Sequence, residues 1–207
     1  LDREKAVLGV YVSGHPLLKF EEEVNVFSTV RFGQPEVVMP GAVVRACGIV
    51  TGVKKKIDKK GNMMAFVTIE DFTGRGECIV FSDPYRQYER YLHQDSMIMA
   101  IGKGEGGGSS LRILVQEVYP LDKVREKFTK SIIVSIRIDD VQENTILELR
   151  KLMEKHRGNC SCYFNVLGDA QTGATVFTAK KFVVEPSQEF MMELQRLLGP
   201  NCVKITG

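Results

Sequence analysis

The sequence lacks the features that mark membrane proteins and secreted, disulfide-rich proteins. No apolar run within its 207 residues approaches the length of a membrane-spanning helix. The five cysteines are odd in number and scattered, and Cys47 and Cys78 fall within apolar strand patterns, so we expect buried thiols from a reducing compartment. The formal net charge is only +2, so attraction to phosphate groups would require a local cluster of basic residues.

Metal-binding and catalytic patterns are missing as well. Cys160 and Cys162 are separated by a single residue, a shorter spacing than that of a zinc knuckle. The acidic candidates Asp71 and Asp139-Asp140 have no partner acids at a spacing that suggests a two-metal site. The histidines are far apart, each at or near a predicted helix end: His15, His93 and His156. We therefore expect no catalytic residue, no metal site and no cofactor in this chain.

Residues 1–40 are predicted to form a helical lead-in. Apolar residues share one helix face over the first eleven positions, and Gly14 followed by His15-Pro16 is a typical helix end. Pro16 can then begin a second helix as its first-turn residue. The chain starts at Leu1 without an initiator methionine, so we expect a piece of a longer protein in which no targeting signal can be read.

Residues 41–122 have the pattern of five short strands with one helix between the third and the fourth. The predicted strands cover 43–53, 64–70, 77–81, 97–101 and 111–118. The helix begins at Asp83-Pro84. Gly48 and Gly52 allow the sharp coiling that a small barrel needs. This order of elements is typical of the OB-fold, a five-stranded barrel that binds oligonucleotides.

The pattern changes after a charged linker at residues 123–130. Residues 131–207 follow the order β-α-β-β-α-β, with helices predicted over 143–155 and from the Ser187 cap to Leu198. That order suits a small α/β two-layer sandwich of the ferredoxin-like kind. The predicted fold class is therefore α+β: a helical lead-in, an OB-fold barrel and a small C-terminal α+β domain.

The longest basic run of the chain lies in the predicted first hairpin of the barrel. Five lysines and one aspartate give residues 54–60 a local charge of +4, and flexible ammonium groups of this kind contact phosphates without reading sequence. Phe66 on the neighbouring strand can offer a flat apolar surface to a base, and strand or turn arginines can extend the basic track. The predicted nucleic-acid contacts are Lys54, Lys55, Lys56, Lys59, Lys60, Phe66, Arg45, Arg75 and Arg112. A solvated hairpin tip, with Phe66 buried in the core, is the alternative.

Residues 4–17, EKAVLGVYVSGHPL, closely resemble the segment that precedes the OB domain in the alpha subunit of bacterial DNA polymerase III. Further motifs agree along nearly the whole chain and in the right order. They are Gly48-Ile49-Val50, residues 59–66, residues 70–74, Pro120-Leu121, residues 125–127 and residues 184–187.

The resemblance implies the non-catalytic C-terminal part of a replicative polymerase in the bacterial cytoplasm. The palm with its catalytic aspartates and Mg²⁺, the exonuclease-related domain and the main sliding-clamp peptide would lie upstream, outside this chain. In that family the OB domain approaches single-stranded template DNA, and the last domain docks the clamp-loader subunit tau. For tau we single out the terminal helix, with Phe190, Met191, Leu194 and Leu198 as candidate contacts.

Two other functions compete with a replicase fragment. The first is an OB module that binds a tRNA anticodon in an aminoacyl-tRNA synthetase, although such a barrel would be followed by a large catalytic domain with class motifs. The second is a purely structural module in which the barrel makes protein contacts and the lysines only confer solubility.

Overall fold

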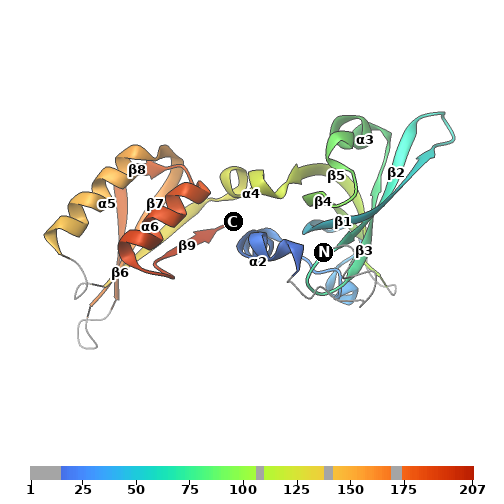
Figure 1. The fold of residues 1–207 in the computed structure, drawn as a ribbon. Coiled ribbons are helices and arrows are strands. Elements are labelled where there is room, and N and C mark those ends of the chain that lie inside the picture. The colour runs from blue at the N-terminus through green and yellow to red at the C-terminus, as the bar shows by residue number, and fades with distance from the viewer. Residues whose placement is uncertain (1–14, 106–109, 138–141, 169–173) are drawn as a thin grey trace. The chain divides into compact units, whose positions relative to one another are not determined.

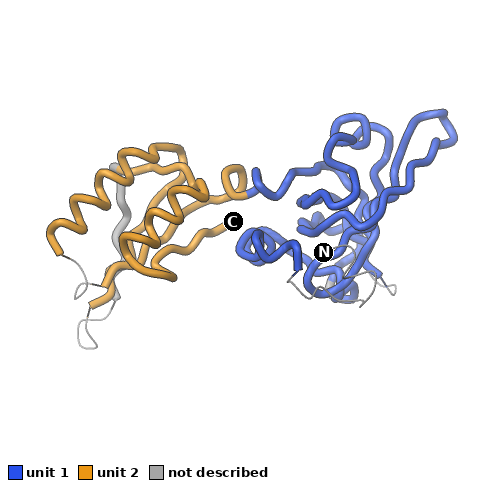
Figure 2. The backbone as a smooth tube through the Cα atoms, viewed as in Figure 1, with its two compact units in different colours: residues 1–124 blue, residues 125–207 orange. Residues whose placement is uncertain are grey.

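The computed structural model describes residues 15–105, 110–137, 142–168 and 174–207. Within it the chain divides into two compact units, residues 1–124 and residues 125–207 (Figure 2). The helix predicted over the first eleven residues and the pair Asp139-Asp140 lie outside the described residues.

The described part of the lead-in consists of short helical turns that pack on the barrel. A 3₁₀ turn, η1 (Pro16–Phe20), runs directly into helix α2 (Glu21–Phe27), and a second 3₁₀ turn follows at η2 (Pro35–Val37). The Nδ1 atom of His15 accepts a hydrogen bond from the backbone N–H of Leu17 at 3.2 Å. Pro16 therefore begins a helical segment as predicted, with His15 as its cap.

The first unit contains a closed five-stranded barrel (Figure 1). Its strands are β1 (Val43–Ile57), β2 (Met63–Glu70), β3 (Arg75–Val80), β4 (Met97–Glu105) and β5 (Arg112–Pro120). They close in the order β1-β2-β3-β5-β4, and the one parallel pairing, between β3 and β5, completes the cylinder. Helix α3 (Ser82–Tyr88) and the 3₁₀ turn η3 (Glu89–Tyr91) connect β3 to β4. This is the OB-fold that the sequence predicted.

Strand β1 is long enough to pair with two neighbours in succession. Its first half, Val43–Ile49, pairs with β4. Its second half pairs with β2 as far as Ile57. The register shifts between Val50 and Gly52, where the strand changes partner. At Gly48 a Cβ atom would lie 2.6 Å from the carbonyl oxygen of Glu70, so only glycine permits this close approach of β1 and β2.

The lead-in also completes the hydrophobic core of the barrel. Phe32 and Val38 belong to the same buried cluster as the inward-facing residues of the strands, such as Val67 and Ile69 of β2. Cys47 and Cys78 are buried free thiols, as expected, and burial raises the pKa of the Cys47 thiol to about 12. None of the described helices is long and apolar enough to cross a membrane.

Helix α4 (Leu121–Phe128) occupies most of the stretch predicted as a linker, and a second sheet follows. The elements are β6 (Ser131–Arg137), α5 (Glu143–Lys155), β7 (Arg157–Leu167), β8 (Ala174–Val184), α6 (Gln188–Leu198) and β9 (Val203–Thr206). The order β-α-β-β-α-β is confirmed. Both helices cover the same face of the sheet (Figure 1), and α6 buries Phe190 and Leu194.

The ferredoxin-like topology, however, is wrong. The strand order is β8-β7-β6-β9, so the two strands joined by α5 are direct parallel neighbours. A ferredoxin-like sheet would split that pair with another strand. Here β6 and β7 stay paired from Ser131–Ser161 to Arg137–Leu167, which leaves no place for an inserted strand.

Candidate nucleic-acid interface

The hairpin between β1 and β2 forms an arm that projects beyond the barrel (Figure 1). We call residues 54–66 the basic arm. Asp58 organises its turn, because one carboxylate oxygen accepts hydrogen bonds from the N–H groups of Lys60 and Asn62, both at 2.8 Å. Gly61 adopts a φ of +84°, which disfavours other residues. The hydrogen bond from Asn62, with that from Lys60, lowers the pKa of the Asp58 carboxyl, so it stays ionised.

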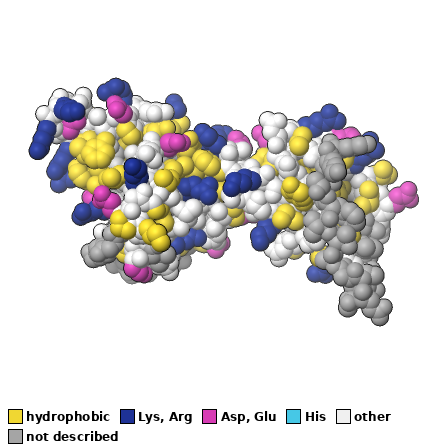
Figure 3. Space-filling view, turned by 180° about the vertical axis from the view of Figure 1, so that it is seen from behind, with side chains coloured by type: hydrophobic (Ala, Val, Ile, Leu, Met, Phe, Trp, Pro, Cys, Tyr) yellow, Lys and Arg dark blue, Asp and Glu magenta, His cyan; other side chains and the backbone are white. Residues whose placement is uncertain are grey.

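The five lysines of the arm are exposed at its surface. Lys54, Lys59 and Lys60 form no ion pair with any carboxylate in the described part of the chain. Figure 3 shows basic side chains gathered at the end of the first unit from which the arm projects. These ammonium groups are therefore accessible to phosphates.

Phe66 lies on the outer face of the barrel and not in its core. It pairs with Lys54 on β1 and with Ile79 on β3, whereas its neighbours Ala65 and Val67 point into the core. Its ring is half-buried, and Nζ of Lys56 lies 5.2 Å from the ring centroid. The structure thus brings Phe66 beside the lysines on one face.

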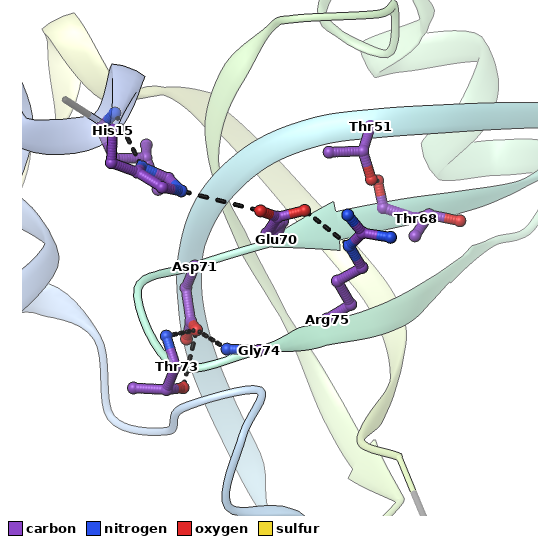
Figure 4. Close-up of polar contacts among 9 residues, drawn as sticks. His15, Thr51, Thr68, Glu70, Asp71, Thr73, Gly74 and Arg75 are labelled. Atoms are coloured by element: carbon purple, nitrogen blue, oxygen red, sulfur yellow. Dashed lines mark hydrogen bonds and ion pairs between the residues drawn. The ribbon is translucent and has the colours of Figure 1, made fainter. Parts of the chain in front are cut away.

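Arg75 and Arg112 lie on the same outer face, and each has a carboxylate partner. Arg75 Nε lies 2.6 Å from Glu70 Oε2, and Arg112 Nε lies 3.7 Å from Glu77 Oε2. Glu70 also faces Nε2 of His15, at 3.8 Å (Figure 4). A phosphate would have to compete with these carboxylates for either arginine.

Arg45 lies apart from the other predicted contacts. It belongs to the half of β1 that pairs with β4, and its N–H donates to the Thr29 hydroxyl at 2.8 Å. Lys54 follows it by nine positions along the strand, a distance of about 30 Å along the backbone. The structure does not place Arg45 near the arm.

Lys55 points to the opposite side of the arm from Lys54 and Lys56. Its Nζ lies 2.9 Å from Glu89 Oε1, and the hydroxyl of Tyr85 donates to the same oxygen at 2.6 Å. The contact with Tyr85 and that with Glu89 raise the pKa of Lys55. This link could not be predicted from local sequence patterns, because Tyr85 and Glu89 follow the lysine by some thirty positions.

Asp71, an acidic candidate in the sequence, has a structural role. One of its oxygens accepts hydrogen bonds from Thr73 and from the N–H of Gly74 (Figure 4), and the other accepts from the N–H of Phe32 at 2.9 Å. The side chain is buried. It therefore fastens the lead-in to the β2–β3 turn, and both of its oxygens are engaged in hydrogen bonds.

The predicted tau contacts lie mostly inside the second unit. Phe190, Met191 and Leu194 are buried, and of the four only Leu198 is partly exposed. These inward side chains hold α6 on the sheet, so a partner would meet other residues. Met192 is the exposed apolar residue of that helix, at 48%.

An ion-pair network joins α5 to α6. His156 Nε2 lies 3.0 Å from Glu193 Oε2, and Nζ of Lys155 lies 2.6 Å from Glu193 Oε1 and 3.0 Å from Glu189 Oε1. His156, Glu189 and Glu193 are close enough together to hold a metal ion. The Lys155 ammonium already provides the positive charge between the two carboxylates.

The two units each match a protein family. Residues 23–121 match the family described as an OB-fold nucleic acid binding domain. Residues 132–198 match the DNA polymerase III alpha subunit, C-terminal domain. The closed barrel and these matches define a nucleic-acid-binding OB-fold followed by a polymerase C-terminal domain.

Curated relatives extend this similarity along the chain. The chain is 26% identical over 208 residues to the DNA polymerase III subunit alpha of Escherichia coli (strain K12), which covers 99% of the chain and 18% of that protein. It is 32% identical over 175 residues to the Thermus aquaticus subunit, covering 80% of the chain and 14% of that protein. The chain is thus homologous to the C-terminal region of the bacterial DNA polymerase III alpha subunit, and it spans less than a fifth of those relatives.

Among solved structures, an asparaginyl-tRNA synthetase from Pyrococcus horikoshii is similar over 42% of this chain and 20% of its own, with 19% identity and a TM-score of 0.32. So low a score carries no argument about function.

Proposed function

We propose that this chain is the non-catalytic C-terminal part of a replicative DNA polymerase and that its barrel binds single-stranded template DNA in the bacterial cytoplasm. The observation that carries the proposal is the projecting arm, whose exposed lysines lie beside an outer barrel face bearing Phe66. OB-fold proteins hold single strands in this way, with cations on the phosphates and aromatic rings under the bases.

The geometry supports binding without sequence preference. Lysine ammonium groups contact phosphates as point charges, and the half-buried ring of Phe66 can stack on any base. The ion pairs of Arg75 and Arg112 make these two residues weaker contacts than Lys54, Lys59 and Lys60. Binding should therefore be weak and should fade as salt rises, with a log–log slope of about −0.7 per phosphate contacted.

A titration of labelled oligo-dT at two salt concentrations tests this function. Replacing Lys54, Lys55, Lys56, Lys59 and Lys60 with alanine should abolish most of the binding. The matched control removes the same charge elsewhere, at Lys19, Lys103, Lys130, Lys151 and Lys204. Equal losses in the two variants would show nonspecific attraction only. Unchanged affinity in the arm variant would favour the structural module, and a preference for tRNA would favour an anticodon-binding function.

We also propose that the second unit docks the clamp-loader subunit tau. Support comes from the match of residues 132–198 to the polymerase C-terminal domain, and from an exposed apolar residue on α6. Met192→Lys should weaken capture of purified tau and leave the circular dichroism spectrum unchanged. Ile146→Lys, at a comparably exposed site on α5, is the control, and equal effects of the two changes would exclude α6 as the specific contact.

A further inference from the structure

The far end of the basic arm carries two exposed apolar side chains next to each other. Ile57 and Met63 are register partners across the hairpin, so their side chains lie on the same face of the arm. Ile57 is 69% exposed and Met63 is 40% exposed. Their face is the one on which Lys55 lies, opposite to that of Lys56 and Phe66.

An exposed hairpin tip does not need this apolar pair, because polar side chains would interact more favourably with water there. Single apolar residues are common on protein surfaces, but here two are paired in register as the last strand pair before the turn of the arm. Lysines flank them: Lys55 lies on the same face of the arm, and Lys59 and Lys60 lie in the turn that follows Ile57. An apolar surface framed by positive charge complements a ligand that has flat apolar groups attached to a polyanion.

We infer that Ile57 and Met63 form an apolar platform for an unpaired base of the bound single strand, while Lys59 and Lys60 hold its phosphates. This inference rests on the proposed DNA-binding function and extends it, because it places a base contact at the arm tip, away from Phe66. Methionine suits such a contact, since its polarizable sulfur packs favourably on aromatic rings. Apolar side chains from DNA-binding arms also pack against base steps in other proteins.

The test compares oligo-dT with an abasic oligonucleotide of the same length, which keeps the phosphates and lacks the bases. The variant Ile57→Thr/Met63→Thr preserves strand propensity and should bind oligo-dT about fivefold more weakly, the low end for one stacked base. Its affinity for the abasic strand should not change. Lys59→Ala/Lys60→Ala should weaken binding to both strands. Val43→Thr, at a 66% exposed site on the other end of β1, is the control and should change neither.

The outcomes separate this inference from the function on which it rests. If the lysine variant loses binding while the Ile57/Met63 variant binds oligo-dT like the wild type, the platform is wrong and the DNA-binding function stands. Equal losses on both strands would also overturn the platform, because they would report a distorted arm. If the wild type binds neither strand, both proposals fail. Binding of phosphatidylglycerol vesicles that depends on Ile57 and Met63, with oligo-dT binding unaffected, would assign the tip to a membrane surface instead.

Discussion

Nζ of Lys55 lies 2.9 Å from Oε1 of Glu89, and this ion pair ties the basic arm to the helical connection between β3 and β4. The Tyr85 hydroxyl donates to the same oxygen and so fixes the carboxylate in place. The hydrogen bond from Tyr85, with that from Lys55, lowers the pKa of the Glu89 carboxyl, which therefore stays ionised at neutral pH. Glu89 thus pairs with Lys55 as a phosphate would, so under the proposed function it would compete with DNA for that lysine.

Glu89→Gln should strengthen binding of oligo-dT at low salt. Without the carboxylate, Lys55 can contact a phosphate, so the log–log salt dependence should become steeper by about 0.7. The same titration as for the wild type measures both quantities. Glu36→Gln removes the same charge from an exposed site in the lead-in, and the competition model fails if the two variants behave alike.

Asp71→Asn should destabilise the barrel by about 1–3 kcal/mol, because the amide nitrogen would face either the Phe32 N–H or the turn N–H groups and leave a buried donor unsatisfied. Amide hydrogen exchange at β2 and β3 measures the free energy of unfolding of the barrel directly. The control is Asp83→Asn, since that side chain is exposed and makes only a distant ion pair with Arg86. Unchanged protection in the Asp71 variant would contradict the structural role.

Gly76→Ala should cost about 1–3 kcal/mol of stability through overpacking. A Cβ atom there would lie 2.2 Å from Cδ1 of Phe32 and 2.6 Å from the carbonyl oxygen of Leu111. At Gly52 the nearest atom, Oγ1 of Thr68, is 3.6 Å away, so Gly52→Ala should be tolerated. Urea unfolding of the two variants tests the pair. If the Gly76 variant were as stable as the Gly52 variant, the close packing of Phe32 against Gly76 would not contribute to the stability of the barrel.

Glu193→Gln should weaken the second unit in a pH-dependent way. The hydrogen bonds from Lys155 and His156 lower the pKa of the Glu193 carboxyl below its ordinary value of 4.5. A group whose pKa is lower in the folded state stabilises above its ordinary pKa, and that stabilisation is lost as the pH falls through the lowered value. The stability difference between wild type and variant should therefore be present at pH 7 and disappear in acid.

Hydrogen exchange at α5 and α6 measures this difference. Glu185→Gln, which removes the same charge at an exposed position, is the control. A Glu193 difference that persists unchanged at acidic pH would mean that the charge of this carboxylate does not matter to the packing of the two helices.

Elements whose signals are local were predicted well. Helix α5 covers the predicted residues, and the Ser187 hydroxyl accepts from the N–H of Phe190 to cap α6 as expected. The helix ends before Gly199, which has a φ of +92°. Strand β1 was predicted to end at Val53 and instead reaches Ile57, because backbone pairing with β2 keeps the lysine run extended. A run of lysines alone does not show that pairing.

The candidate site likewise has features that follow from local sequence and features that depend on contacts between distant segments. The charge cluster is local, so the arm lysines could be singled out from the sequence; the structure shows them exposed, and their contact with DNA stays a prediction. The carboxylate partners of Lys55 and Arg112 come from distant segments and could not be foreseen. Amphipathic spacing marked Phe190 and Leu194 correctly as one helix face, but the sheet covers that face.

By itself the sequence determined the order of the elements within the barrel and within the C-terminal domain, the Ser187 cap, the basic run and the family, because each depends on neighbouring residues or on motifs read along the chain. Only the tertiary structure decided which strands are neighbours, which side chains face outward and which cations are already paired. Those properties depend on contacts between segments far apart in sequence, whose free energies are set by burial and distance after the chain has folded.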